Sequence, residues 1–191
     1  METLMTSETA AVPTQAEAPS GINHMVFNVR DIEESHEFWT KMMGFTQTGQ
    51  LESNEGFRFY SGKVNGQTTH HDLALVQIEG ETEEPDRWTM RAKTVGANHI
   101  AITWPDRDSW LKQIAWLQAN DVKFHMRMNH GMTHSAYVSD PNGIGIEVLY
   151  EIPDEYWKQD VNKGLNFAEI LPKDGPEALE DSMEYDKFLK V

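Results

Sequence analysis

The feature that most constrains the fold is an internal repeat of a short strand-like segment. Asn23-His24-Met25 opens one segment and Asn98-His99-Ile100 opens the other, and the two histidines lie 75 residues apart (99 − 24). Each segment alternates apolar and polar residues and is followed by a stretch with helical spacing. A repeat of this kind indicates one supersecondary unit that occurs twice. Two short strand–helix units can also coincide by chance, so the remainder of each half has to agree.

The first half reads as β-α-β-β-β. A strand is expected at 21–29 and an amphipathic helix at 32–43, with Asp31 as its N-cap and Gly44 just past its C-terminal end. Three short strands are expected to follow, at 45–51, 56–61 and 70–78.

The same order returns after a charged connection at 79–94 that contains Pro85. A strand at 96–104, a helix at 107–120 and a further element at 122–128 precede a β-hairpin, whose strands are expected at 134–139 and 144–150 around the turn Asp140-Pro141-Asn142-Gly143. The sequence therefore predicts an α+β fold of two tandem βαβββ modules, at about 21–80 and 96–150, that close around one metal cleft.

The two ends of the chain differ in character from this single catalytic domain at 21–150. Residues 1–20 lack periodicity and are expected to form a flexible tail. Residues 151–191 are expected to form a C-terminal helical extension, with helical spacing at 154–163 and an acidic helix candidate at 177–189.

Composition excludes several classes of function. A formal charge of −15 argues against nucleic acid and anionic membranes as partners, because both require basic patches. The chain has no cysteine, so neither disulfides nor thiolate metal sites are possible. It also lacks a long apolar run and the pattern of a signal peptide, and we expect a cytoplasmic protein.

The candidate metal ligands are His24, His99 and Glu147. Glu147 shares one face of its strand with Gly145 and Leu149, and a buried carboxylate needs a cation as partner. Two imidazoles and one carboxylate form the facial arrangement that binds non-haem Fe(II) and leaves coordination positions open. A lone histidine on a strand is more often a hydrogen-bonded core residue, but two at equivalent positions of a repeat favour a metal site.

Three more residues stand where proton transfer or substrate binding would need them, namely His71, His130 and Tyr137. Imidazoles with pKa values near neutrality can move protons, and a phenol can hold a substrate oxygen by a hydrogen bond. The remaining histidines are interpreted as surface or packing residues: His36, His70, His125 and His134.

Taken in order, these motifs resemble the type I extradiol ring-cleavage dioxygenases of the vicinal oxygen chelate superfamily. The resemblance rests on Asn23-His24, His71-Asp72 before Leu73-Ala74-Leu75, Asn98-His99-Ile100-Ala101, His130-Gly131, and Tyr137 followed after ten residues (147 − 137) by Glu147. It spans about 21–150, and the length of the chain is similar to that of the one-domain branch, whose members act on 2,3-dihydroxybiphenyl and other catechols.

The resemblance implies a cofactor, a reaction and partners. Fe(II), or Mn(II) as in some relatives, would be bound by His24, His99 and Glu147. The substrates would be a small aromatic diol and O₂, with ring cleavage beside the hydroxyls, in aromatic hydrocarbon catabolism. His71 would act as an acid–base group, and His130 and Tyr137 would bind substrate oxygens. Family members commonly assemble, so we expect a homo-oligomer.

Two other functions remain open on this scaffold. A glyoxalase-like isomerase commonly uses four protein ligands, with an acid on the fourth strand of each module, whereas the first half here offers no glutamate before Glu79. A metal-free small-molecule-binding protein would have no need of a His/His/Glu set surrounded by His71, His130 and Tyr137.

Overall fold

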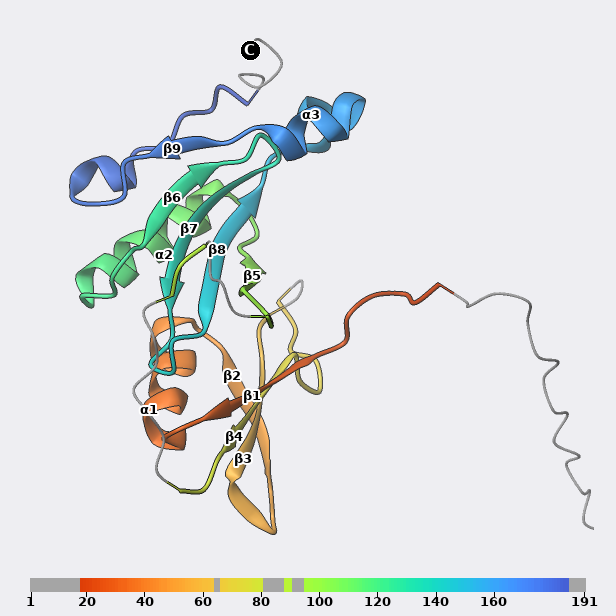
Figure 1. The fold of residues 1–191 in the computed structure, drawn as a ribbon, viewed down its shortest axis with the longest axis vertical. Coiled ribbons are helices and arrows are strands. Elements are labelled where there is room, and N and C mark those ends of the chain that lie inside the picture. Colours follow the sequence, from red (N-terminus) through yellow and green to blue (C-terminus); the bar gives the residue numbers. More distant parts are fainter. Residues whose placement is uncertain (1–17, 64–65, 81–87, 91–94, 186–191) are drawn as a thin grey trace, which may run out of the picture.

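The computed structural model describes residues 18–63, 66–80, 88–90 and 95–185. Within these residues the chain forms two βαβββ modules arranged along the long axis of the molecule, with a C-terminal extension beyond the second module (Figure 1). The predicted α+β fold and the order of its elements are confirmed. The predicted tail lies mostly outside the described residues.

The first module consists of β1 (Met25–Val29), α1 (Ile32–Glu37), β2 (Thr46–Leu51), β3 (Asn54–Ser61) and β4 (Leu73–Gln77). Helix α1 begins where predicted, because the Asp31 carboxylate accepts hydrogen bonds from the first free backbone amides. It continues as a π-helix, η1 (Phe38–Met42), and ends at Gly44, whose φ of 75° suits a residue without a side chain.

The first sheet has the order β1-β4-β3-β2, and β1 and β4 run parallel. Strand β4 starts at Leu73, so the strand expected at 70–78 begins later than predicted, and His71 lies in the loop before it. Asp72 explains the later start: its carboxylate accepts hydrogen bonds from the Ser61 hydroxyl and the Gly62 backbone amide, which holds the preceding segment in a loop.

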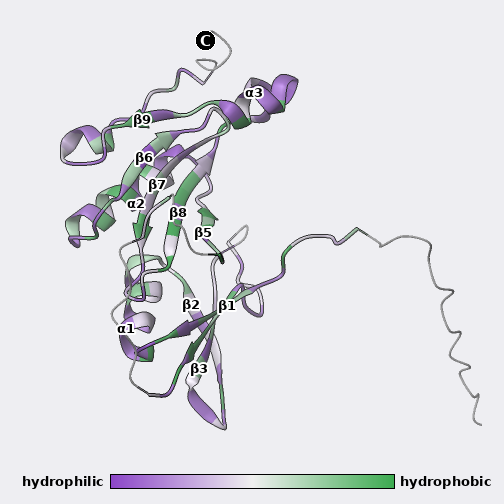
Figure 2. Ribbon diagram, viewed as in Figure 1, coloured by the Kyte–Doolittle hydropathy of each residue, from purple (hydrophilic) through white to green (hydrophobic). Residues whose placement is uncertain are grey.

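The second module consists of β5 (His99–Thr103), α2 (Arg107–Ala119), β6 (Met126–Asn129), β7 (Thr133–Ser139) and β8 (Gly145–Glu151). The predicted hairpin is present, with Tyr137 paired to Glu147. Strand β8 lies between β5 and β7, and most of its residues are buried and hydrophobic (Figure 2). A central strand covered on both faces is expected to have this composition.

The two modules pack through their helical sides. One hydrophobic cluster runs from Trp39 of the first module to Trp110 of the second. At its edge the hairpin turn contacts the start of α1, because Asn142 accepts from the Arg30 amide and donates to the Ser35 hydroxyl. Burial of this shared apolar surface is the main force that holds the modules together.

The extension departs from the predicted pair of helices. The segment expected to be helical at 154–163 forms two 3₁₀ turns, η2 (Asp154–Tyr156) and η3 (Lys158–Asp160), before a short helix, α3 (Val161–Asn166). Strand β9 (Glu169–Leu171) then pairs with β6 at the edge of the second sheet. The only helical turn in the described part of the acidic segment is η4 (Pro176–Leu179); residues 186–191 lie outside it.

Asp181 explains why the acidic segment is not a continuous helix. Its carboxylate has no exposed surface and forms ion pairs with Arg127 and His134, while also accepting a hydrogen bond from Tyr150. Burial alone raises the pKa of Asp181, but the contacts with His134, Tyr150 and Arg127 bring it below its ordinary value. These tertiary contacts outweigh helix propensity, which is a weak preference.

No helix in the described ranges is long and apolar enough to cross a membrane.

Candidate metal centre

The six residues singled out from the sequence fall into two groups, one in each module. His24, just before β1, lies against His71, with 4.5 Å between ring centroids. His99, His130, Tyr137 and Glu147 form a second group on β5, β7 and β8 and on the loop before β7. The order of strands explains the second group, because β8 lies between β5 and β7.

A chain of hydrogen bonds links the second group. His99 Nε2 lies 3.0 Å from Glu147 Oε2, and the Tyr137 hydroxyl donates to Glu147 Oε1 over 2.7 Å. His130 Nε2 lies 3.0 Å from the same hydroxyl oxygen. Because the hydroxyl proton is directed at Glu147, His130 serves as the donor to the oxygen of Tyr137. Glu147 is thus held from both sides.

The spacing of His99 and Glu147 suits a metal ion. Two donors bound to one ion at about 2.1 Å, at right angles to each other, lie about 3.0 Å apart. The observed 3.0 Å between His99 Nε2 and Glu147 Oε2 matches this value. Both side chains are largely buried, at 26% and 10% exposure, which makes an uncompensated carboxylate costly. The pair therefore fits two neighbouring positions of a divalent ion.

Each candidate histidine is oriented by the asparagine that precedes it. His99 Nδ1 lies 2.8 Å from Asn98 Oδ1, and His24 Nδ1 lies 2.8 Å from Asn23 Oδ1. An amide oxygen only accepts, so in both histidines Nδ1 carries the proton. The other nitrogen, Nε2, is the one that would face an ion, as second nitrogens do in metal-ligating histidines. In His99 this nitrogen is hydrogen-bonded to Glu147, and an ion would take the place of the proton between them.

The first-module group consists of imidazoles, and the neighbouring carboxylate of Asp72 is bound to the Ser61 hydroxyl and the Gly62 amide. His71 contacts His24 and also His70, whose Nδ1 lies 2.8 Å from its own Nδ1. Partial burial lowers the pKa of His71, and the nearby His24 and His70 lower it further. His71 is therefore mainly neutral at pH 7 and able to accept a proton.

Tyr137 remains a hydrogen-bond donor across the physiological range. Burial raises the pKa of its phenol far above the ordinary value, and the hydrogen bond to the Glu147 carboxylate raises it further. The phenol therefore keeps its proton. In this state it can neutralise part of the charge on Glu147 or on an oxygen bound beside it.

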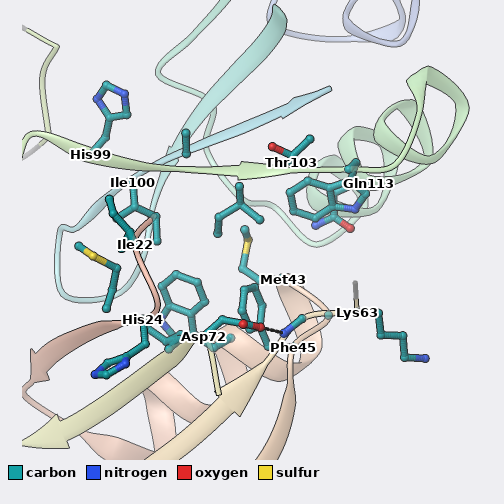
Figure 3. A pocket seen from close by; sticks show the side chains of 18 of the residues that line it. Ile22, His24, Met43, Phe45, Lys63, Asp72, His99, Ile100, Thr103 and Gln113 are labelled. Atoms are coloured by element: carbon teal, nitrogen blue, oxygen red, sulfur yellow. Dashed lines mark hydrogen bonds between the residues drawn. The ribbon is translucent and has the colours of Figure 1, made fainter. Parts of the chain in front are cut away.

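The two groups do not meet within the described residues. There, no set of three His, Cys, Asp or Glu side chains is close enough to hold a metal ion. A cavity of about 840 Å³ separates β1 from β5, and His24 and His99 lie at its edge. Their imidazoles point away from each other, while apolar side chains such as Ile100 and Met43 face the cavity (Figure 3).

The remaining histidines also have structural contacts. His125 Nε2 lies 2.8 Å from Ser139 Oγ, and His70 contacts His71. His134 is buried and paired with Asp181, and His36 contacts the Tyr60 hydroxyl.

Sequence reasoning missed Trp88. Its indole stacks on the Tyr137 ring, with 5.5 Å between centroids and 9° between planes, and lies edge-on to His99 at 6.2 Å. Trp88 belongs to the charged connection between the modules, where no periodic pattern indicates which way a side chain points. The one available signal was a tryptophan in an otherwise polar stretch.

The chain is similar in sequence to known proteins. A family model described as Glyoxalase/Bleomycin resistance protein/Dioxygenase superfamily matches residues 21–148. A lactoylglutathione lyase of Pseudomonas putida is 27% identical over 150 residues, which cover 69% of this chain and 85% of that protein. A catechol-2,3-dioxygenase of Bacillus subtilis (strain 168) is 24% identical over 143 residues; these cover 73% of this chain but only 44% of that protein.

Solved structures share the fold at low identity. A glyoxalase/dioxygenase from Nostoc punctiforme aligns with a TM-score of 0.56 and 15% identity, covering 74% of this chain and all of its own (100%). A fosfomycin resistance protein from Listeria monocytogenes aligns with a TM-score of 0.52 and 15% identity, covering 74% of this chain and 99% of its own. At such identities the likeness concerns the fold alone.

Proposed function

Because the chain belongs to the Glyoxalase/Bleomycin resistance protein/Dioxygenase superfamily, we propose that it is a metal-dependent extradiol dioxygenase. The reaction inserts both atoms of O₂ into a catechol-type substrate and opens the ring beside the hydroxyls. The metal is Fe(II), with Mn(II) as an alternative ion for the same ligand types.

One observation carries the choice of dioxygenase over isomerase: the first module has no acid at the position equivalent to Glu147. Glu147 pairs with Ala101, two residues after His99. The residue two after His24 is Val26, and its partner on β4 is Ala74. A four-ligand centre with an acid from each module cannot form, so the candidate set is two histidines and one glutamate. Such a set leaves three positions for a diol and O₂.

The residues of the chain divide the work as follows. His99, Glu147 and His24 hold the ion. The Tyr137 hydroxyl, which is directed at Glu147, binds a substrate oxygen, and His130 behind it supplies or accepts a proton. His71, beside His24, serves as the second acid–base group. Iron, when bound, supplies the electron transfer between the diol and O₂, which protein side chains cannot provide.

We further propose that two copies of the chain share each centre. Packing through the helical sides keeps the His24 group apart from the His99 group, and the two imidazoles point away from each other (Figure 3). A symmetric pair of chains brings the first module of one copy to the second module of the other and creates two equivalent sites. This arrangement supplies His24 as the third ligand.

The first experiment tests the reaction. The full-length protein is purified without oxygen, loaded with Fe(II), and mixed under air with catechol, methylcatechols and 2,3-dihydroxybiphenyl. We expect uptake of O₂ and a yellow ring-opened product. Full iron occupancy without colour or oxygen uptake on any of these diols would contradict the proposal.

The second experiment tests the shared site. His24→Ala and His99→Ala are each expected to be inactive, but in a mixed pair one site keeps both intact histidines. Random exchange between equal amounts of the two variants should then restore about a quarter of wild-type activity. No recovery after unfolding and refolding the mixture would place all ligands in one chain.

A lactoylglutathione lyase-like activity is the second candidate, favoured by the 27% identity to such an enzyme. The same protein preparation is assayed for formation of lactoylglutathione with Fe(II), Mn(II), Ni(II) and Zn(II). Turnover there, with none on diols, would replace the dioxygenase assignment.

A further inference from the structure

Trp88 occupies the same face of the second sheet as Glu147. Its indole stacks on Tyr137 and lies edge-on to His99, and its exposed fraction is 9%. Both of these neighbours belong to the candidate metal centre, one as ligand and one as the donor to Glu147. A buried indole in this position excludes water from one side of the group.

Gly145 leaves the space that the indole fills. A Cβ atom built on Gly145 would lie within 3.0 Å of three indole atoms of Trp88, which is closer than side chains approach in proteins. The backbone of Gly145 does not itself require glycine, because its φ is not in the left-handed range. The requirement for glycine at this position is therefore steric and comes from Trp88.

Asn98 ties the connection between the modules to His99. Its backbone oxygen accepts from Trp88 Nε1 over 2.6 Å, and its side-chain amide donates to the backbone oxygens of Thr89 and Met90 over 3.3 and 3.2 Å. The oxygen of the same amide accepts from His99 Nδ1. One residue thus fixes both the histidine ring and residues 88–90 of the connection.

We propose that Trp88 is a positioning residue for the metal centre: wedged over Gly145 and bound to Asn98, it holds Tyr137 and His99 in the orientation that lets them act on Glu147 and on an ion. The inference rests on the proposed function. Trp88 also contacts the His125 ring, with 5.4 Å between centroids, which lies outside the candidate centre. It touches neither metal nor reacting atoms, and its positioning role acts through the rings of Tyr137 and His99.

If Trp88 has this role, replacing its indole should weaken metal binding. Partners that orient metal ligands typically contribute about 10- to 100-fold to metal affinity. Trp88→Leu removes the stacking surface and the donor to Asn98, whereas Trp88→Phe keeps a ring on Tyr137. We expect the Kd for Co(II) to rise about tenfold or more in the leucine variant and only a few-fold in the phenylalanine variant.

The matched control is Trp157→Leu. Trp157 is an indole in the extension whose Nε1 also donates to a backbone oxygen, that of Ile152. Its removal takes away the same chemical group while leaving the indole that stacks on Tyr137 and lies edge-on to His99, and the Kd for Co(II) should be unchanged. Co(II) binding to the full-length metal-free protein is followed by calorimetry and by quenching of tryptophan fluorescence, which should be weaker in Trp88→Phe.

Gly145→Ala supplies an independent test without removing the indole. In the wild-type background the new methyl group displaces Trp88, so Co(II) affinity should fall about as far as in Trp88→Leu. In a Trp88→Ala background the same change should have almost no further effect, since the space is already open. Gly49→Ala in β2, where the nearest side-chain atom lies at 3.9 Å, is the strand control.

The outcomes separate this inference from the proposed function. Wild-type protein that binds no Co(II) or Fe(II) overturns both. Wild-type binding together with equal Kd values for Trp88→Leu and Trp157→Leu overturns the positioning role and leaves the proposed function standing. An equal effect of Gly145→Ala with and without Trp88 also overturns it.

Discussion

The two modules share one plan and differ in the residues that carry chemistry. In both, an Asn-His pair precedes or opens the first strand, and the asparagine oxygen lies 2.8 Å from Nδ1 of the histidine. The second module adds Glu147, Tyr137 and His130 in one hydrogen-bonded chain, whereas the first has Ala74 where the acid would be. The two modules therefore share the position of the candidate histidine, and the acid of the candidate ligand set lies in the second module.

The halves also differ in how they are reinforced. The second module carries strand β9 and the buried ion pairs of Asp181 with Arg127 and His134. The first sheet ends at β2 with no added strand in the described residues. The module that contains Glu147 is therefore stabilised by additional contacts with the C-terminal extension.

His99→Ala removes the histidine that pairs with Glu147. We expect complete loss of iron retention and of diol cleavage, with circular dichroism close to that of the wild type, because His99 is partly exposed and outside the shared core. His36→Ala, which changes a helix histidine of the first module, is the control and should keep iron. A His99→Ala protein with stoichiometric iron would refute the ligand assignment.

Tyr137→Phe removes the hydroxyl between Glu147 and His130. The ion should still bind, since no ligand is lost, but kcat should fall about 100-fold because a positioned proton donor is gone. Single-turnover kinetics with the iron-loaded variant measure the effect. A fall in iron content with unchanged kcat per iron would show instead that Tyr137 supports the ligand.

Ala74→Glu gives the first module the acid that it lacks. A fourth protein ligand occupies a position needed by the diol or O₂, so we expect tighter metal retention and about a tenfold or greater loss of ring cleavage. Ala74 is fully buried, so the glutamate should also destabilise the metal-free protein. Ala74→Gln is the control: it should be equally unstable but should not be rescued by metal. Unchanged ring cleavage in a folded Ala74→Glu protein would contradict the role given to Ala74.

Asp181→Asn tests how far the buried ion pairs of Asp181 with Arg127 and His134 stabilise the second module. Loss of one partner from a buried ion pair leaves Arg127 uncompensated and should lower the free energy of unfolding by about 3 kcal/mol, with little change in diol chemistry. The pKa of Asp181 is lowered in the folded state, so its contribution is complete above the ordinary value of 3.8 and is lost as pH falls through the folded value. Urea unfolding of wild type and variant at several pH values should show this difference shrinking only in acid.

Local sequence signals were sufficient for most of the fold. Asp31 and Gly44 bounded the first helix correctly, and Asp140-Pro141-Asn142-Gly143 fixed the hairpin, because caps and turns depend on neighbouring residues alone. The repeat of Asn23-His24 and Asn98-His99 indicated two modules. The register of the hairpin, which pairs Tyr137 with Glu147, was added by the structure.

The remainder depended on contacts between distant residues. The acidic segment after Pro176 has the composition of a helix, but the pairing of Asp181 with Arg127, 54 residues away (181 − 127), draws it into an extended path. The position of Trp88 could not be predicted, because the indole packs over Gly145, which has no side chain to indicate a contact. The sequence likewise predicted His24 beside His99 and Glu147, a grouping that is absent from the part of the chain that the structure describes.

Strand β9 has a consequence for the behaviour of the protein in concentrated solution. By pairing with β6 it saturates a row of main-chain donors and acceptors that would otherwise stand open to any extended peptide. Strand β9 is itself only three residues long, so the strand that now forms this edge of the sheet offers little main chain for pairing with another copy. Strand β9 of the C-terminal extension therefore limits edge-to-edge association of the protein, whatever reaction the centre catalyses.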